Sequence, residues 1–159
     1  MIRPAAEEDR DLVRDVEVAS GQLFREVGMA AIADDEPMWL EEWSRYRPLT
    51  FVWEEDGVVA GFVMCEPLGD ALHIEQLSVD PAFGRRGIGA ALVRYACDVV
   101  AEGRAVTLTT FRDVPWNMPF YERLGFVEHV DPSPELRARS EEESAAGLDP
   151  VTRVIMIRS

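Results

Sequence analysis

The run LHIEQLSVDPAFGRRGIGAALVRYACDVV, from Leu72 to Val100, decides the fold of this chain. It begins with residues typical of a β-strand, crosses a glycine-rich turn at positions 84–89, and continues with the apolar spacing of a helix. The apolar positions on one face of that helix are Ile88, Leu92, Tyr95 and Val99. Because such a turn points several backbone N–H groups and the positive end of a helix dipole at one place, it predicts an anion site, for instance for a pyrophosphate.

Two widespread phosphate-binding motifs also place a glycine-rich turn before a helix. A Walker A loop requires Gly-Lys-Ser/Thr at the helix start, but Gly89 is followed by two alanines, which excludes it. A dinucleotide fingerprint that starts at Gly87 requires a third glycine where this chain has Leu92, so that motif fits poorly.

The run resembles instead the central motif of the GNAT superfamily of acyl-CoA-dependent N-acyltransferases. Residues 77–81, Leu-Ser-Val-Asp-Pro, are similar to the strand end of that motif, and residues 87–89, Gly-Ile-Gly, to the loop that enters its helix. The Arg or Gln of the motif falls on Gly84, so Arg85 or Arg86 would supply the missing side chain.

A second segment, Phe-Tyr-Glu-Arg-Leu-Gly-Phe at positions 120–126, resembles the Tyr-x-x-Leu-Gly-Phe that closes the GNAT site. The resemblance covers nearly the whole chain. It implies an α/β fold with a mixed, mostly antiparallel central sheet of about seven strands and about four flanking helices. The strand before the glycine turn and residues 105–111 would form a parallel pair through a right-handed crossover. In this family such a pair splays apart at the CoA site.

Length and composition predict one globular domain, residues 1–159, with 47% apolar and 29% charged residues. No apolar run approaches the roughly 20 residues that span a bilayer, and MIRPAAEEDR at the N-terminus lacks the apolar core of a signal peptide. Cys65 and Cys97 are expected to be buried thiols. We therefore expect a cytoplasmic protein.

The net charge of −14 argues against nucleic acid and an anionic membrane as partners, because both require a basic face. It favours a cationic acceptor. An anionic cofactor would need a region of positive charge on this acidic protein. The segment between Pro81 and Cys97 has no acidic residue and contains Arg85, Arg86 and Arg94, so it can provide that charge.

Sequence patterns place the N-terminal elements. Residues 2–5 are a predicted strand, and apolar spacing predicts a helix over 7–27 that ends at Gly28. A second helix is predicted to begin near Pro37.

Residues 50–54 and 58–66 predict a hairpin, followed by a strand over 71–79. In the GNAT resemblance the two helices flank the acceptor pocket, so three aromatic residues either line it or pack in the core: Trp39, Trp43 and Tyr46.

The C-terminal third predicts a short helix between Asn117, its N-cap, and Gly125, its stop. Residues 126–130 and 151–157 are the last predicted strands. A long polar loop is predicted between them, over 132–150, and a loop of this length is either disordered or functional.

An amine acceptor must lose a proton before it attacks a thioester, which costs about 4.6 kcal/mol at pH 7 for a reference pKa of about 10.4. On the strand before the turn, His73, Glu75 and Leu77 alternate onto one face. We expect Glu75 to be the general base, directly or through water, and His73 to be the second choice.

The resemblance assigns the remaining contacts. Tyr121 would donate a hydrogen bond to the departing sulfur of CoA, and Asn117 would touch pantetheine or cap its helix. The strand end would meet the thioester and pantetheine, and the turn would bind the pyrophosphate. These expected cofactor-binding residues are Leu77, Ser78, Val79, Arg85, Arg86, Gly87, Ile88, Gly89 and Ala90.

The resulting expectation is an N-acetyltransferase that moves an acetyl group from acetyl-CoA, its cosubstrate, to a primary amine within a ternary complex. No metal is expected. A small cationic amine is the preferred acceptor, while a protein lysine or N-terminus and an amino-acid-like metabolite stay open. A non-catalytic acyl-CoA-binding domain and a nucleotide-binding module are the alternatives. The sequence leaves a homodimer and the accepted acyl length open.

Overall fold

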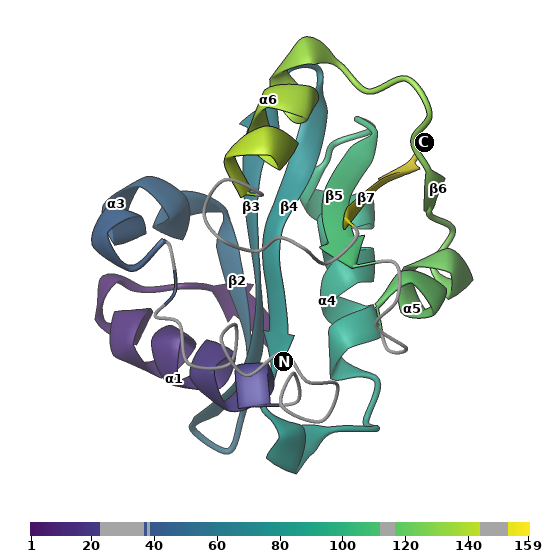
Figure 1. Ribbon diagram of the computed structural model, residues 1–159. Helices are drawn as coiled ribbons and strands as arrows, with labels where there is room; N and C mark the ends of the chain where they lie inside the picture. Colours follow the sequence, from purple (N-terminus) through teal and green to yellow (C-terminus); the bar gives the residue numbers. More distant parts are fainter. Residues whose placement is uncertain (23–36, 38, 112–116, 144–152) are drawn as a thin grey trace. The chain divides into compact units, whose positions relative to one another are not determined.

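The computed structural model describes residues 1–22, 37, 39–111, 117–143 and 153–159 (Figure 1). Its seven strands form one mixed sheet in the order β1-β2-β3-β4-β5-β7-β6. The strands are β1 (Ile2–Pro4), β2 (Thr50–Glu55), β3 (Val58–Leu68), β4 (Ala71–Val79), β5 (Val106–Phe111), β6 (Val127–Glu128) and β7 (Arg153–Arg158). The described α-helices are α1 (Arg10–Gly21), α3 (Trp43–Tyr46), α4 (Ile88–Tyr95), α5 (Met118–Arg123) and α6 (Pro134–Glu143).

The chain divides into two compact units, and β3 and β4 contribute to both. Unit 1 comprises residues 1–65 and 76–95, and unit 2 comprises residues 66–75 and 96–159. The predicted α/β class and the predicted parallel pair are confirmed, since β4 pairs in parallel with β5, while the pairs β1–β2, β2–β3, β5–β7 and β6–β7 are antiparallel.

In unit 1, β2 and β3 form the predicted hairpin. Its turn has Asp56 at φ 52° and Gly57 at φ 77°, the left-handed conformation that a two-residue hairpin turn requires. The register shifts once along the hairpin, because Trp53 pairs with Gly61 while Glu54 pairs with Val59. Such an irregularity increases the twist of a strand locally.

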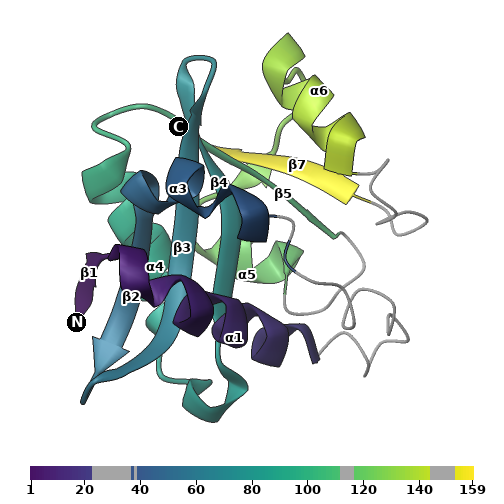
Figure 2. The same ribbon diagram turned by 90° about the vertical axis from the view of Figure 1, so that its left-hand side faces the viewer.

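Helices cover both faces of this hairpin. Helices α1 and α3 lie on one face (Figure 2), where Trp39, Trp43 and Tyr46 are buried in a core with Val52 and Phe62. The rings of Trp39 and Trp43 are 5.6 Å apart. Of the two roles expected for the three aromatic residues, the structure places them in the core. On the other face the ring of Tyr95 in α4 lies 5.2 Å from that of Phe51 in β2.

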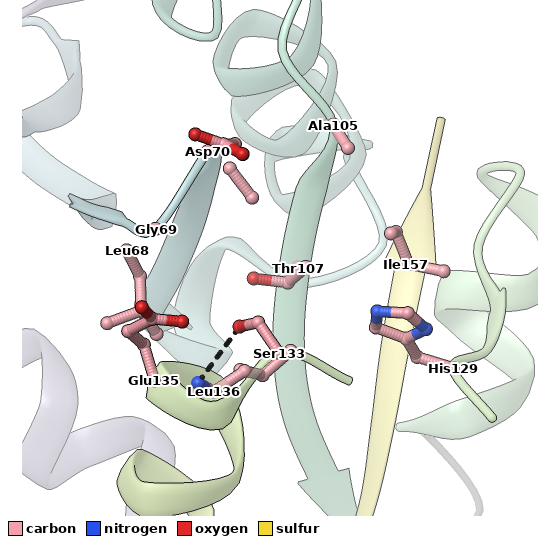
Figure 3. Close-up of a pocket in the computed structure, with 11 residues that line it drawn as sticks. Leu68, Gly69, Asp70, Ala105, Thr107, His129, Ser133, Glu135, Leu136 and Ile157 are labelled. Carbon is pink, nitrogen blue, oxygen red and sulfur yellow. Dashed lines mark hydrogen bonds between the residues drawn. The ribbon is translucent and has the colours of Figure 1, made fainter. Parts of the chain in front are cut away.

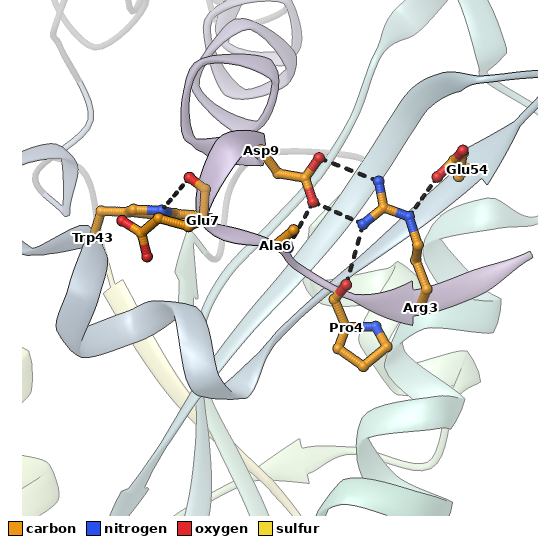
Figure 4. A network of polar contacts seen from close by, with 7 residues as sticks. All are labelled: Arg3, Pro4, Ala6, Glu7, Asp9, Trp43 and Glu54. Atoms are coloured by element: carbon orange, nitrogen blue, oxygen red, sulfur yellow. Dashed lines mark hydrogen bonds and ion pairs between the residues drawn. The ribbon is translucent and has the colours of Figure 1, made fainter.

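A partly buried ion pair stabilises the N-terminal edge of unit 1 (Figure 4). Arg3 of β1 donates to both carboxylate oxygens of Asp9, at 2.7 and 3.1 Å, and also pairs with Glu54 of β2. The N–H of Ala6 donates to the same Asp9 carboxylate at 2.7 Å. Hydrogen bonding by Arg3 is the main reason that the pKa of Asp9 lies below its ordinary value.

Three predicted helices differ from those found. The predicted helix over 7–27 begins with a short 3-10 turn before α1, and Leu12, one of the residues behind its apolar spacing, is 47% exposed. The predicted continuation to residue 27 and the stop at Gly28 lie outside the described residues. The helix expected from Pro37 is instead a 3-10 turn at 40–42 followed by α3.

The helix after the glycine turn also differs. Its last part, residues 96–100, is a π-helix. The wider turn changes the angular spacing of the side chains, so Ala96 and Val100 are buried while Val99 is 53% exposed. The prediction that Val99 shares the apolar face was therefore wrong.

In unit 2, β5 lies between β4 and β7, and β6 pairs with β7. The loop predicted over 132–150 is wrong for its described part, which forms helix α6. Pro134 opens this helix, and the hydroxyl of Ser133 accepts a hydrogen bond from the N–H of Leu136 at 3.2 Å, as an N-cap does. No helix among the described residues is both long and apolar enough to cross a membrane.

Candidate active site

The glycine-rich turn of unit 1 begins with a capped bend. The carboxylate of Asp80 accepts a hydrogen bond from the N–H of Ala82 at 2.9 Å and so caps a 3-10 turn over 81–83. Arg85 and Gly87 then adopt φ 63° and φ 76°, and α4 begins at Ile88. The first N–H groups of a helix have no intrahelical acceptor. The expected anion site therefore coincides with a true helix start.

The arginines of this turn differ in their surroundings. Arg86 donates to the carboxylate of Glu55 at 3.0 Å, and its guanidinium lies 5.3 Å from the ring centroid of Phe83. All three arginines expected to offset the acidic charge are exposed, namely Arg85 and Arg86 in the turn and Arg94 in α4. Arg86 therefore already has an acidic partner, and Arg85 is the better of the two expected replacements for the side chain missing at Gly84.

The strand end before the turn lies close to β3. The N–H of Asp80 donates to the carbonyl of Ala60 at 2.8 Å, and Ser78 is buried. Because backbone groups alternate along a strand, those of Leu77 and Val79 point away from β3. This is the orientation that the expected contacts with pantetheine require.

Gly61 is a residue of this region that the sequence interpretation missed. A Cβ atom there would lie 3.0 Å from the carbonyl oxygen of Ser78 and 3.3 Å from side-chain carbons of Ile88 and Val79. A glycine inside an apolar strand signals such a close approach. Gly61 thus lets β3, the end of β4 and the start of α4 pack together.

In unit 2, the expected bases lie side by side on β4. Nε2 of His73 is 3.9 Å from a carboxylate oxygen of Glu75, so the predicted shared face is confirmed. His73 is almost fully buried, and its Nδ1 lies 3.0 Å from the hydroxyl of Thr107 on β5. Burial, and next the positive charge of Arg139, lowers the pKa of His73 to about 4. His73 is therefore neutral at neutral pH.

Arg139 of α6 contacts Glu75 directly, which no sequence pattern indicated. Its guanidinium Nη1 ion-pairs with the carboxylates of both Glu75 and Glu66, and Glu142 lies 3.7 Å from its Nε. The side chains of Arg139, Glu66 and Glu75 are all less than one fifth exposed. The carboxylate expected to be the base is thus part of a partly buried charge cluster.

Tyr121 lies on α5 and contacts two aromatic side chains. Its ring centroid is 5.0 Å from that of Phe120 and 5.8 Å from that of Phe126, both in edge-to-face geometry. Burial raises the pKa of its phenol above the ordinary value. Asn117 occupies the predicted N-cap position, but its side chain makes no capping hydrogen bond. The capping role expected for that side chain was wrong.

Glu17 of α1 is a second carboxylate that the sequence interpretation missed. It accepts a hydrogen bond from the indole Nε1 of Trp39 at 2.7 Å, and the side chain of Gln76 also hydrogen-bonds to it. Burial raises its pKa. Glu17 lies four residues after the buried Val13 and therefore on the same face of α1, and this spacing was the signal that could have indicated a buried carboxylate.

Unit 2 also contains an open pocket of about 260 Å³ (Figure 3). It is lined by Gly69 and Asp70 between β3 and β4, by Thr107 of β5, by His129 just after β6, and by Glu135 of α6. Thr107 therefore both lines this pocket and contacts the buried imidazole of His73.

Comparisons with known proteins agree with this architecture. The model of the acetyltransferase (GNAT) family matches residues 19–126. The S-(2-succino)cysteine N-acetyltransferase of Bacillus subtilis is 26% identical over 136 residues, which cover 79% of this chain and 82% of the relative.

Solved structures that share the fold include two N-acetyltransferases. The ribosomal-protein-S18-alanine N-acetyltransferase of Escherichia coli has a TM-score of 0.70 at 19% identity, covering 99% of this chain and 92% of that one. The PaiA N-acetyltransferase of Thermoplasma acidophilum, in complex with coenzyme A, has a TM-score of 0.67 at 17% identity, covering 100% and 98%. The chain therefore belongs to the acetyltransferase (GNAT) family. It is an acyl-CoA-dependent N-acetyltransferase whose cosubstrate is acetyl-CoA.

Proposed function

We propose that residues 1–159 act as one domain that acetylates a small cationic primary amine by direct attack in a ternary complex. The observation that carries this proposal is Glu75, a carboxylate on β4 that lies beside a neutral imidazole and is only partly buried. A carboxylate can accept the proton of an ammonium, and Glu75 is partly exposed, whereas His73 is almost fully buried and is therefore the weaker candidate.

In the proposed reaction Glu75 takes one proton from the ammonium, directly or through water. The nitrogen lone pair then attacks the thioester carbonyl carbon, so a C–N bond forms and the C–S bond breaks. The nitrogen loses its second proton, which goes to the leaving sulfur. Tyr121 stabilises the developing thiolate by a hydrogen bond, because a phenol with a raised pKa keeps its proton.

The cofactor contacts proposed for unit 1 follow its backbone. The N–H groups around Gly87, Ile88 and Gly89 bind the pyrophosphate, with Arg85 as the nearby cation. Backbone groups of Leu77 and Val79 meet the thioester and pantetheine. In unit 2, Asn117 is proposed as a further pantetheine contact, since its side chain makes no capping hydrogen bond.

The acceptor class has a second candidate. The Bacillus subtilis relative is named for a cysteine derivative, which favours an amino-acid-like amine. The acidic balance of 30 Asp and Glu against 16 Lys and Arg favours instead an acceptor with a net positive charge. We place the small cation first because of this charge balance.

A panel of amines tests the proposal. Release of CoA from acetyl-CoA is measured with spermidine, with S-(2-succino)cysteine and with a peptide that begins with alanine. The expected result is the highest kcat/KM with spermidine. A preference for either other acceptor reassigns the substrate class, and tight binding of acetyl-CoA without any turnover indicates a non-catalytic domain. Calorimetry that finds no binding of acetyl-CoA at millimolar concentration overturns the proposal as a whole.

A further inference from the structure

Helix α6 contacts the rest of unit 2 through few side chains. Leu136 is the one buried residue in its described part, and Arg139 is the partly buried charged residue one turn further on. The Arg139 guanidinium joins two strands, because Glu66 belongs to the end of β3 and Glu75 to β4.

The chemistry of this junction depends on the guanidinium. An arginine presents several N–H donors in a planar fork and can therefore serve two carboxylates at once, which a lysine ammonium does less well. Two carboxylates in one partly buried place repel each other, and without a cation between them one tends to take up a proton. Glu75 in that protonated state could not act as a base.

We propose that Arg139 is a positioning residue for the acetyl transfer, in that it holds the Glu75 carboxylate ionised and in one orientation, while Glu66 holds Arg139. This inference rests on the proposed role of Glu75 as the base. Among the described residues, the charged and titratable groups whose contacts with this cluster are resolved are Arg139 of α6, His73 of β4, Glu66 and Glu142. His73 is neutral at neutral pH, and Arg139 brings a positive charge into direct contact with Glu75.

The test is a double-mutant cycle of Arg139→Met and Glu75→Gln. The readout is kcat/KM from pH 5 to 9, with acetyl-CoA and whichever amine of the panel turns over fastest. Arg139→Met is expected to move the acid limb of the profile up by about one pH unit, which lowers the rate about tenfold on that limb. In the Glu75→Gln background the same change is expected to have no further effect.

Glu66→Gln provides the opposite charge change. It removes a like charge and leaves the guanidinium to Glu75, so the acid limb is expected to move to lower pH. A role of Arg139 in docking α6 alone would not produce opposite shifts. Arg137→Gln is the matched control, since Arg137 lies on the same helix with a side chain that is 57% exposed, and it is expected to leave the profile unchanged.

The outcomes separate this inference from the proposed function. If Glu75→Gln keeps the full kcat/KM, the base role itself fails. If Glu75→Gln loses activity but Arg139→Met causes the same loss in both backgrounds, the base role stands and the positioning role is overturned. Acid limbs that stay in place in both Arg139→Met and Glu66→Gln also overturn it. Should Arg139→Met not fold, Arg139→Lys and Glu66→Gln give the same comparison.

Discussion

His73 and Thr107 are direct partners in the register of the parallel strands β4 and β5, and Nδ1 of His73 lies 3.0 Å from Oγ1 of Thr107. Both side chains are buried. Burial removes the water that would hydrate a positively charged imidazole, so protonation of His73 is unfavourable and its pKa is lowered to about 4.

The first prediction concerns stability against pH. Between about pH 6.5 and pH 4 the unfolded chain binds a proton at His73 that the folded chain does not. The free energy of unfolding therefore falls as the pH falls through this window, by up to about 1.4 kcal/mol per pH unit. Urea unfolding at several pH values measures this slope. His73→Gln should flatten it, and His129→Gln is the control that should keep it.

A second prediction concerns the ion pair of Arg3 and Asp9. Asp9→Asn removes charge-assisted hydrogen bonds from Arg3 and is expected to lower the free energy of unfolding by about 2 kcal/mol at pH 7. Since the pKa of Asp9 is lowered by folding, its contribution is fully present above about pH 4 and is lost as the pH falls toward the folded value.

Asp15→Asn is the control for that variant. Asp15 is 66% exposed on its side chain and lies 3.9 Å from Arg14, so its removal is expected to change stability by less than about 1 kcal/mol. Equal losses in both variants, measured by urea unfolding, would show that burial of the Arg3 pair does not matter.

A third prediction compares two glycines with the same geometry. Gly57 and Gly87 have φ of +77° and +76°, and a Cβ atom would meet nothing within 4 Å at either. Replacement of each by alanine is expected to destabilise the protein by about 1 kcal/mol through backbone strain alone. Only Gly87→Ala is expected to weaken binding of acetyl-CoA, measured by calorimetry. Equal affinities in the two variants would remove the turn at Gly87 from the cofactor site.

A fourth prediction concerns Tyr121. Tyr121→Phe is expected to lower kcat about 100-fold with an unchanged Kd for acetyl-CoA, because the lost hydrogen bond forms only as the sulfur leaves. The raised pKa keeps the phenol protonated, so the alkaline side of the pH profile should have the same shape in both proteins. Tyr95→Phe is the control, at a tyrosine whose ring lies 5.2 Å from that of Phe51 in a tilted arrangement. Full turnover in Tyr121→Phe would exclude the role.

The sequence alone was sufficient for the parts of the fold that depend on local order. Short-range patterns of turn residues and apolar spacing predict three of these parts: the hairpin at Asp56 and Gly57, the strand before the glycine turn, and the helix start at Ile88. The parallel pairing of β4 with β5 also followed, since a strand, helix and strand in succession have one favoured handedness.

Other features depended on packing that local patterns do not encode. Val99 keeps its apolar spacing in the sequence, yet the π-helix at 96–100 turns it outward. The capping signal at Ser133 and Pro134 was present, but the polar composition of the segment obscured α6.

What the sequence determined by itself was the order of strand, turn and helix, and with it the family and the cosubstrate. Only the tertiary structure determined the protonation state of His73 and the ion pairing of Glu75, the proposed base. The pKa of His73 and the pairing of Arg139 with Glu75 arise from burial and from contacts between residues 64 or more positions apart. Charge and hydration act through space, so no local pattern in the chain records them.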